Sequence, residues 1–419
     1  MKIKRPKGTN DIFGKDAYKW QFLENEIKQT CKNFGIQEIR TPIFEYKNLF
    51  ERGVGETTDV VQKEMFTFKD RGEREYALKP ESTAGTARAY LENSLNADVQ
   101  PTKLYYIAPS FRDERNQAGR FKQFHQFGVE MFGSFDSSCD AEVISFVYEL
   151  LKRLNIKDVT LKLNSLGVNE CRKTYNQKLK SFVETKLECL CEDCKQRYEK
   201  NPLRVLDCKN PKCKEALKDA PTTIESLDEE CKNHFESLKK YLDIMNIPYE
   251  VDPKIVRGLD YYTKTVFEFV CKSEKLGSQS TICGGGRYDN LIKECGGQST
   301  GAVGFGMGME RVLMLMEEQG IQIEEENRPL IYIGSMGEVG FTKAQQIAYS
   351  LRQKGIYVEY DIVRRSVKAQ LKYADKINAK YVIIIGDNEI ETDKVNLKDM
   401  DKSEQREITL SNLENEILQ

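Results

Sequence analysis

A row of polar and aromatic side chains alternates along the segment Phe121–Met131 and has the chemistry of a ligand-binding surface. Successive side chains of a β-strand point to opposite faces, so Phe124, Gln126 and Glu130 share one face with the bare Gly128. The stretch from Phe124 to Glu130 would span about 20 Å at about 3.3 Å per residue. That length holds a nucleotide joined to an amino acid. From this segment alone, a solvated hairpin with charged turns is the alternative.

Arginines cluster just before this row. Arg112, Arg115 and Arg120 flank it, and Arg257 opens the segment Arg257–Tyr262, which contains two adjacent tyrosines. A guanidinium offers a planar fork of donors that suits phosphate and carboxylate oxygens. These cations therefore indicate an anionic ligand, although interface packing would also explain the tyrosine segment.

Glycines recur with a period of two at Gly304, Gly306 and Gly308. One face of a strand would carry no side chains there, so a ligand can lie against the backbone. A helix is predicted from Met309, which places Arg311 in its first turn. A helix dipole favours anions at that end, so an arginine there is better explained by a facing phosphate. Glycine-rich packing against another helix is the alternative.

Two shorter motifs are weaker indicators. Glu81 and Thr83 offer a carboxylate and a hydroxyl that could receive an ammonium group, but the same residues cap helices well. Gly284–Asp289 is predicted to be a glycine turn. It lacks the Lys-Ser/Thr of a phosphate loop and does not match a dinucleotide fingerprint, so any nucleotide site is of another kind.

The chain contains twelve cysteines, several of them clustered in one short stretch. In a chain without an export signal, most should be reduced thiols. The spacing is Cys-x2-Cys followed by Cys-x4-Cys, which resembles a four-thiolate zinc site. Reduced thiols in a helical insertion are the alternative. The candidate zinc ligands are Cys191, Cys194, Cys208 and Cys213.

These groups must be positioned by a chain of 419 residues, long enough for two to three domains at about 150 residues each. Residues 1–325 contain glycine-punctuated strands with one apolar face, which predict an antiparallel sheet with helices on one side. Residues 169–246 are rich in Lys and Glu and predict a helical, cysteine-rich insertion. After a linker predicted at Glu324–Pro329, strands and helices alternate over 330–419, which favours a largely parallel α/β domain.

Composition excludes several classes of protein. Hydrophobic residues make up 39% and charged residues 31%, which argues against a disordered chain. The net charge of -2 does not suit a general nucleic-acid coat, but leaves room for a local basic patch. Two histidines argue against a Ser-His-Asp hydrolase. No apolar run reaches the roughly 18 residues of a membrane span, and no secretory signal is evident, so a cytoplasmic protein without membrane contact is expected.

Together the motifs resemble those of class II aminoacyl-tRNA synthetases. Phe111-Arg112 through Glu130 resembles motif 2, Gly304–Arg311 resembles motif 3, and Thr41-Pro42 onward resembles the dimer-forming motif 1. Arg257–Tyr262 is similar to the histidine-specific element of histidyl-tRNA synthetases. The likeness covers nearly the whole chain, including Gly285-Gly286-Arg287-Tyr288-Asp289 and Asn201-Pro202-Leu203-Arg204.

The resemblance implies activation of L-histidine by ATP with Mg²⁺, transfer to the 3′ end of tRNA(His), and a homodimer. Arg112 and Arg257 would grip the α-phosphate as catalytic groups. By the same resemblance, histidine would be bound by Glu81, Thr83, Gln126, Glu130, Tyr261 and Tyr262. ATP would be bound by Phe124, Arg311, Gly304, Gly306 and Gly308, together with Arg112. The acceptor end of tRNA would meet Arg115 and Gln117.

Basic residues recur every four positions from Arg364 to Lys380, and on one helix they would form a stripe. A solvated face is the ordinary interpretation; the resemblance favours contact of Arg364, Lys368 and Lys372 with anticodon-stem phosphates.

The family pattern is not kept at Lys79, Ser82 and Asn116. Two rival functions are a catalytically silent paralogue that regulates a histidine-biosynthesis enzyme and a tRNA-binding module without catalysis.

Overall fold

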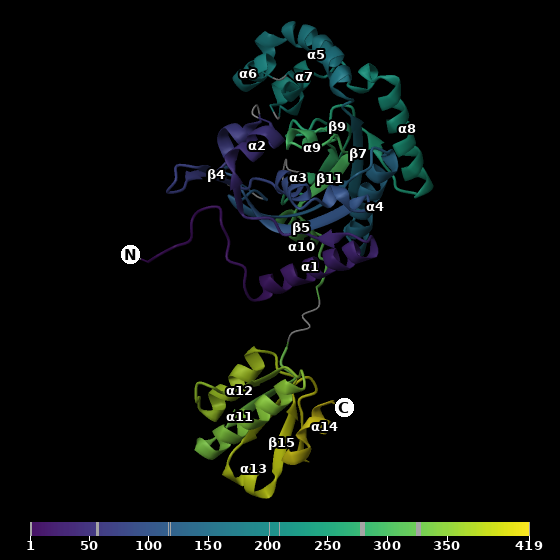
Figure 1. Ribbon diagram of the computed structural model, residues 1–419. Helices are drawn as coiled ribbons and strands as arrows, with labels where there is room; N and C mark the ends of the chain where they lie inside the picture. Colours follow the sequence, from purple (N-terminus) through teal and green to yellow (C-terminus); the bar gives the residue numbers. More distant parts are fainter. Residues whose placement is uncertain are drawn as a thin grey trace. The chain divides into compact units, whose positions relative to one another are not determined.

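The computed structural model divides the chain into two compact units, Met1–Gln322 and Ile323–Gln419 (Figure 1). It describes residues 2–55, 58–115, 117, 119–200, 202–208, 210–276, 281–323 and 328–418. Most of the linker predicted at Glu324–Pro329 lies outside these residues, as do Asn116 and Asn201. Within the described ranges, every helix is too short or too polar to cross a membrane.

An eight-stranded sheet forms the centre of the first unit. Its six inner strands run antiparallel to their neighbours, and only the short outer strands β1 and β8 pair in parallel. The predicted antiparallel sheet is therefore confirmed. In spatial order the strands are β1 (Gln37–Glu38), β5 (Thr102–Phe111), β6 (Gln123–Phe132), β11 (Ala302–Gly308), β10 (Thr281–Arg287), β9 (Thr263–Cys271), β7 (Val159–Ser165) and β8 (Glu250–Val251).

One face of this sheet is covered by helices α1 (Lys15–Asn33), α4 (Ser137–Arg153) and α10 (Met309–Glu318) (Figure 1). Phe127 of β6 reaches this side, with its ring 5.8 Å from that of Phe146 and 5.4 Å from that of Phe305. The alternation in β6 thus buries its apolar residues against helices. Its polar row is left on the opposite face.

A three-stranded sheet lies beside the main one, in the order β2 (Phe44–Tyr46), β4 (Glu75–Leu78), β3 (Thr67–Lys69). Two helices accompany it, α2 (Lys47–Val54) and α3 (Thr83–Glu92). The stretch from about Ile36 to Met131 is rich in β-branched and aromatic residues broken by Gly and Pro, which predicts strands and loops; that prediction is wrong for both helices. α3 escapes detection because its first two turns are buried almost all round, so no amphipathic period is visible.

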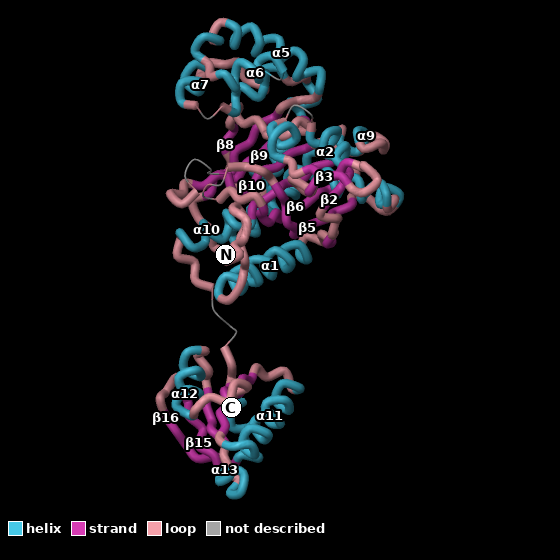
Figure 2. The backbone as a smooth tube through the Cα atoms, turned by 90° about the vertical axis from the view of Figure 1, so that its left-hand side faces the viewer, coloured by secondary structure: helices cyan, strands magenta, loops and turns pink. Residues whose placement is uncertain are grey.

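The insertion is helical, as predicted. α5 (Asn169–Glu184), α6 (Glu192–Lys200) and α7 (Pro211–Ala216) group together at one end of the unit (Figure 2), while α8 (Glu229–Ile244) packs against α4. A short 3₁₀ segment, η4 (Pro202–Asp207), lies between α6 and α7. The insertion therefore packs against the rest of the first unit through α8 and has a small core of its own.

The second unit has a five-stranded sheet flanked by α11 (Gly337–Gln353), α12 (Val367–Lys376), α13 (Asp387–Thr392) and α14 (Leu413–Leu418). The α/β character is as predicted, but the sheet is only partly parallel because two antiparallel strands follow β14. Its order is β13 (Val358–Tyr360), β12 (Ile331–Ser335), β14 (Tyr381–Ile385), β15 (Lys394–Asp399) and β16 (Glu404–Thr409).

The single helical stripe expected from Arg364 to Lys380 is wrong in its extent. α12 contains Lys368, Lys372 and Lys376, which are exposed. Arg364 precedes the helix at a positive φ of 57°, pairs with Glu338 and lies over the Phe341 ring. The four-residue period continued past both ends of the helix, where the backbone no longer follows it.

Candidate active site

A cavity of about 370 Å³ opens over the polar face of β6, β11, β10 and β9. The two arginines predicted to act together, Arg112 and Arg257, both line it, although they come from distant segments. Arg120 and Arg311 join them, so four guanidinium groups surround one space. The cavity is also lined by the carboxylates of Glu114, Glu268 and Glu310, by the Gln126 amide and by the Phe124 ring.

Arg112 and Phe124 are held as a pair. The guanidinium carbon of Arg112 lies 5.3 Å from the centroid of the Phe124 ring, and its Nε donates to the carbonyl of Pro80 at 2.9 Å. A cation beside an aromatic face is attracted by the ring quadrupole. The pair offers a flat aromatic surface and a positive charge at the same wall of the cavity.

Arg257 lies partly buried at the cavity wall and is balanced by Glu268, which the sequence did not single out. Its guanidinium donates to Glu268, whose second oxygen accepts from the Thr281 hydroxyl at 2.9 Å. Burial works against the charge of Arg257, yet Glu268 raises the pKa of the guanidinium above its usual value. Glu268 pairs in register with Gly284, so period two would have placed it on this face.

The glycines of β11 make room for side chains of β6 rather than leaving a wholly bare surface. The Glu130 carboxylate occupies the place of a side chain at Gly304, and the Gln126 amide does the same at Gly306. Gly306 and Gly308 line the cavity, whereas Gly304 is covered by Glu130. The prediction that all three would lie open to a ligand is therefore wrong for Gly304.

The predicted glycine turn at Gly284–Asp289 is also wrong, because Gly284, Gly285 and Gly286 lie within strand β10. The Arg257 guanidinium occupies the space beside Gly284, and the Tyr262 ring approaches Gly286. These positions lack side chains because neighbouring groups cross the strand there. A run of glycine inside a strand cannot be told from a turn by composition.

Glu130 is the centre of a fully buried cluster beside the cavity. Its carboxylate accepts from the Thr83 hydroxyl at 2.7 Å, from the Tyr106 hydroxyl at 3.0 Å and from the Tyr288 hydroxyl. Burial raises its pKa to about 8, against the opposing effect of these hydroxyl donors. The carboxylate is thus fixed by three donors in a dry environment.

Tyr106 and Tyr288 were missed from the sequence. Tyr106 pairs in register with Gly128, and its hydroxyl fills the place of the absent side chain. The bare glycine in the polar row therefore admits a tyrosine from the neighbouring strand. Aligning the two strands by period two across their predicted hairpin would have found Tyr106; Tyr288 lies in the Gly285–Asp289 element that resembles the family, but no role was predicted for it.

Glu81 has the helix-start role that the sequence left open. Its two carboxylate oxygens accept the backbone N–H groups of Thr83 at 2.7 Å and Ala84 at 2.9 Å. Burial raises its pKa, and these N–H donors act in the opposite direction. The carboxylate is therefore anchored at the start of α3, next to Thr83 and the Glu130 cluster.

Tyr261 and Tyr262 belong to the same buried region, with ring centroids 4.6 Å apart. The Tyr262 ring lies 5.8 Å from the guanidinium carbon of Arg257. With Glu81, Thr83 and Glu130 they lie outside the lining of the described cavity. Gln126 lines the cavity, and its buried Oε1 has no hydrogen-bond partner among the described residues.

Arg311 is tied to two backbone segments. Its Nε donates to the Gly119 carbonyl at 3.1 Å and its Nη1 to the Thr281 carbonyl at 2.8 Å. Burial lowers its pKa, with the positive charge of Arg120 acting in the same direction. A cation whose pKa is lowered in this way is stabilised in its charged form by an arriving anion. Arg311 therefore links the loop after β5 to β10 at the cavity edge.

The loop between β5 and β6 presents Arg115 and Gln117, both exposed. Gln117 and Arg120 form an isolated bridge that closes the loop on itself. The two side chains predicted to meet tRNA are thus available at the surface next to the cavity, and they take no part in its lining.

Arg287, the last residue of β10, is structural. It is fully buried and donates to Asp140 at 2.9 Å, to Asp289 at 3.0 Å and to the carbonyl of Ser134 at 2.7 Å. A buried guanidinium needs such partners on every donor. Its bond to Asp140 ties β10 to α4.

The four insertion cysteines come together, as their spacing predicted. The sulfur atoms of Cys191, Cys194, Cys208 and Cys213 all lie within 4.8 Å of one another, and all but Cys191 are buried. The backbone N–H of Cys191 donates to the sulfur of Cys213 at 3.2 Å. All twelve cysteines of the chain are free of disulfides.

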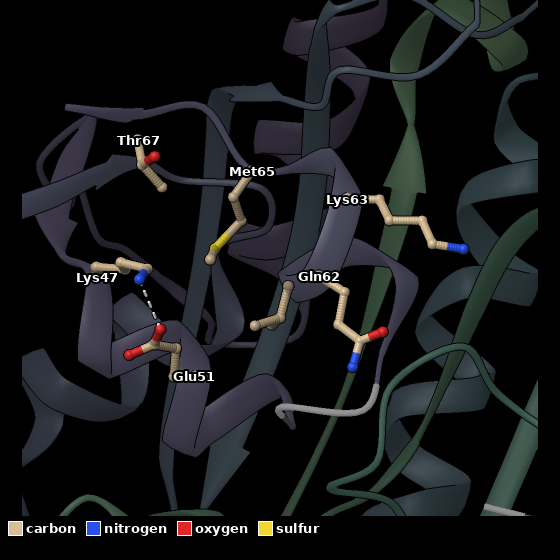
Figure 3. A pocket seen from close by; sticks show the side chains of 7 residues that line it. Lys47, Glu51, Gln62, Lys63, Met65 and Thr67 are labelled. Carbon is tan, nitrogen blue, oxygen red and sulfur yellow. Dashed lines mark ion pairs between the residues drawn. The ribbon is translucent and has the colours of Figure 1, made fainter. Parts of the chain in front are cut away.

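A second, separate pocket of about 540 Å³ contains none of the predicted site residues. It is lined by α2, the segment Val60–Glu64 and Thr67, and a Lys47–Glu51 ion pair of 3.0 Å crosses its wall (Figure 3). Its polar, open lining lacks the buried charges of the first cavity.

The antiparallel sheet with a polar row, an arginine pair and a helix after the glycine strand is the catalytic fold of class II aminoacyl-tRNA synthetases. The family described as histidyl-tRNA synthetase matches residues 8–312, and the anticodon binding domain family matches residues 330–419. The chain belongs to the histidyl-tRNA synthetase family, and the predicted membership and fold class are confirmed.

Relatives support this over the full length. A histidine--tRNA ligase of Thermoanaerobacter pseudethanolicus is 53% identical, with 100% of this chain and 99% of the relative covered. One from Clostridium perfringens is 51% identical, with 98% of each covered. The crystal structure of the S. aureus apo histidyl-tRNA synthetase has a TM-score of 0.85 and 37% identity, with 100% of both chains covered.

We predict that Glu130 makes stability depend on pH. Its ordinary pKa is 4.5 and the folded value is about 8, so the folded state binds this proton more tightly than the unfolded state. The contribution is full below about pH 4.5 and is lost as pH rises through about 8. Relative to Glu130→Gln, the wild type should lose on the order of 4 kcal/mol between pH 5 and pH 8.5.

Thermal unfolding at several pH values measures this difference in the protein without ligands. The exposed carboxylate variant Glu236→Gln is the control and should track the wild type. Parallel curves for wild type and Glu130→Gln would contradict the assignment.

Proposed function

We propose that the cavity activates L-histidine with ATP to give histidyl-adenylate and that the same site passes the histidyl group to the 3′ end of tRNA(His). The observation that carries this proposal is the convergence of Arg112 and Arg257 on one cavity beside the buried Glu130 cluster. Chemistry of this kind depends on placing charge and reactants rather than on a protein base.

In the first step, a carboxylate oxygen of histidine attacks the α-phosphorus of ATP, the bond to the β-phosphate oxygen breaks, and pyrophosphate leaves. Arg112 and Arg257 offset the negative charge shared by the attacking carboxylate and the phosphorus centre. Phe124 stacks on adenine, while Arg112 keeps its bond to the Pro80 carbonyl. Arg311, with its pKa lowered by burial, receives the γ-phosphate at the cavity edge.

In the second step, a ribose hydroxyl at the 3′ end of the tRNA attacks the carbonyl carbon of the adenylate, and AMP leaves. Arg115 and Gln117 stand exposed on the loop beside the cavity, where an acceptor end would enter. The Gln117–Arg120 bridge closes the loop, so the backbone that carries Arg115 and Gln117 is held in place. We assign them to the tRNA.

The Glu130 cluster supplies the histidine pocket. Glu130 and Tyr262 would bond the two imidazole nitrogens, Tyr261 would line the ring, and Gln126 would orient the carboxylate. Glu81 and Thr83 would take the α-ammonium group, since the Glu81 oxygens are already fixed by two N–H donors. Apolar competitors would leave buried polar groups unpaired and be rejected strongly.

Magnesium accompanies ATP in this family, and the lining suits it. Glu114 and Glu268 place carboxylate oxygens in the cavity, and Mg²⁺ prefers oxygen donors completed by substrate phosphates. These two side chains would hold the ion together with ATP. When bound, it would offset charge on the departing pyrophosphate.

The insertion cysteines form a structural zinc site in this proposal. Four thiols within 4.8 Å of one another match the Cys₄ donor set of tetrahedral zinc. The N–H donated to Cys213 suits a sulfur that carries negative charge. Such a site would hold α6, η4 and α7 together in a segment with a small core.

A homodimer is proposed from the exposed aromatic face of the small sheet. Phe44, Tyr46 and Phe68 are 50%, 52% and 43% exposed, yet their rings meet around Tyr76. Clustered exposed aromatic groups mark association surfaces. The cluster lies in the segment that follows Thr41-Pro42, where the dimer-forming motif was predicted. We expect the protein to act in the cytoplasm, where its tRNA substrate is charged.

The silent-paralogue alternative is less supported. An ATP phosphoribosyltransferase regulatory subunit/histidyl-tRNA synthetase from Bacillus halodurans C has a TM-score of 0.67 but only 21% identity, which shows a shared fold alone. The relatives above 50% identity are named histidine--tRNA ligase over the full chain. The residues assigned to the chemistry are all present.

We expect ATP–pyrophosphate exchange to depend on histidine alone among the twenty amino acids. Arg257→Ala and Arg112→Ala should each lower kcat by about 100-fold or more, because each removes charge stabilisation at the reacting phosphorus. Isotope exchange with each amino acid in turn measures the first effect, and steady-state rates measure the second. Lys28→Ala, on the exposed face of α1, is the control. No histidine-dependent exchange would exclude the proposed activity.

Neutralising Arg364, Lys368 and Lys372 to Gln should weaken tRNA binding at low salt and reduce the salt slope by about two. Adenylation should be unchanged, since these residues lie in the second unit. Filter binding at several salt concentrations measures both quantities. A matched variant neutralises three other exposed lysines of that unit, Lys354, Lys394 and Lys402. Equal effects of the two triple variants would contradict the assignment.

Protein purified without added zinc should contain one zinc ion per chain by elemental analysis. Cys208→Ser should lose it and unfold at a lower temperature, because one of four thiolate ligands is removed. Cys189→Ser is the matched control, since Cys189 is exposed and outside the cluster. Metal-free wild-type protein would exclude the zinc site.

A further inference from the structure

The insertion reaches the active site through one buried arginine. Arg204 of η4 is only 6% exposed, although no residue of η4 lines the cavity. Its Nη1 donates to the backbone carbonyl of Arg257 at 3.1 Å. Arg204 therefore bonds the backbone of the residue whose guanidinium is assigned to the α-phosphate.

A second contact fixes the direction of Arg204. Its Nη2 lies 3.8 Å from the carboxylate of Asp59, which also accepts from Arg197 at 3.0 Å. Arg197 in turn lies 3.4 Å from the carbonyl of Arg204. The carboxylate thus offsets the charge of Arg204 while leaving Nη1 to bond Arg257. A buried guanidinium held on two sides has little freedom to move.

Apolar packing connects the same segment to both cores. Leu203 and Leu206 pack against the cluster that contains Val256, Tyr261 and Tyr262, and they also pack against the insertion core that contains the cysteines. η4 therefore forms the joint between the insertion and the loop that precedes β9. Any displacement of the insertion core would be passed to the Arg257 loop through this joint.

The Arg257 loop depends on such support. Residues 254–262 form no strand or helix, so ladder hydrogen bonds do not fix the peptide at Arg257. Its side chain must nevertheless fit against Gly284 and bond Glu268. Displacement of a reacting group by about 1 Å can cost about 100-fold in rate.

We propose that Arg204 is a positioning residue for adenylation, which holds the backbone of Arg257 so that its guanidinium reaches the α-phosphate. This rests on the proposed function. It gives the helical insertion a role in the chemistry of the cavity, since η4 carries Arg204 and is flanked by the cysteine-bearing helices α6 and α7.

Single-turnover formation of histidyl-adenylate tests the proposal in the full-length protein. Arg204→Met should lower the rate by about 10- to 100-fold while the KM for histidine in pyrophosphate exchange stays within about twofold. Arg204→Lys keeps the charge and should recover part of the rate. Arg197→Met is the matched control: it removes an arginine that shares Asp59 but has no bond to Arg257, and should stay within about threefold.

A double-mutant cycle separates positioning from general stability. In an Arg257→Ala background, Arg204→Met should have no further effect, because its influence runs through Arg257. Thermal unfolding of each variant is measured in parallel. If Arg204→Met does not fold, Arg204→Lys decides: a lower rate at unchanged unfolding temperature supports the proposal.

Three results would overturn the proposal. The first is a rate of adenylate formation near that of the wild type for Arg204→Met, or for Arg204→Lys where only that variant folds. The other two are an equal loss of rate from Arg204→Met in the Arg257→Ala background and an equal loss of rate with Arg197→Met. Histidine-dependent exchange by the wild type is the separate test of the proposed function. Its absence would reject the activity itself, whereas its presence with an active Arg204→Met would reject only the positioning role.

Discussion

The placement of Arg257 is the constraint on which the site depends. A guanidinium taken out of water is costly unless its charge and donors are matched. Here Glu268 matches the charge, Thr281 holds Glu268, and Gly284 leaves space for the group. An arriving phosphate would meet a cation that is already partly desolvated and fixed. Little reorganisation then remains for the reaction itself, which is the condition for strong electrostatic catalysis.

The same logic explains why glycine is so frequent in β10 and β11. At each of Gly284, Gly304 and Gly306 a functional side chain from another strand or loop crosses the backbone, namely Arg257, Glu130 and Gln126. A methyl group at any of these sites would displace a charged or polar group from its partners. The glycines therefore leave the space that these three polar side chains occupy.

Much of this could be predicted from the sequence, and the failures have physical causes. Period two in β6 gave the correct face for Phe124, Gln126 and Glu130, since a strand fixes the side of every residue. Contacts between strands are a different matter. Tyr106 above Gly128 and Glu268 beside Gly284 depend on register, which one strand does not specify. The predicted turn at Gly284–Asp289 was wrong for the same reason, because glycine in a strand interior reflects its neighbours.

The insertion shows how far local patterns reach. Its cysteine spacing indicated a four-thiol cluster, with scattered reduced thiols as the alternative, and the structure brings the four sulfur atoms together. The role of η4 was not visible, since the bond from Arg204 to the Arg257 carbonyl joins residues far apart in the chain and involves backbone. Arg204 is nevertheless buried and charged in a segment of low regularity. Such a residue costs free energy unless its charge is paired, and here Arg204 pairs with Asp59 and bonds the backbone carbonyl of Arg257, the residue that we propose acts on the α-phosphate.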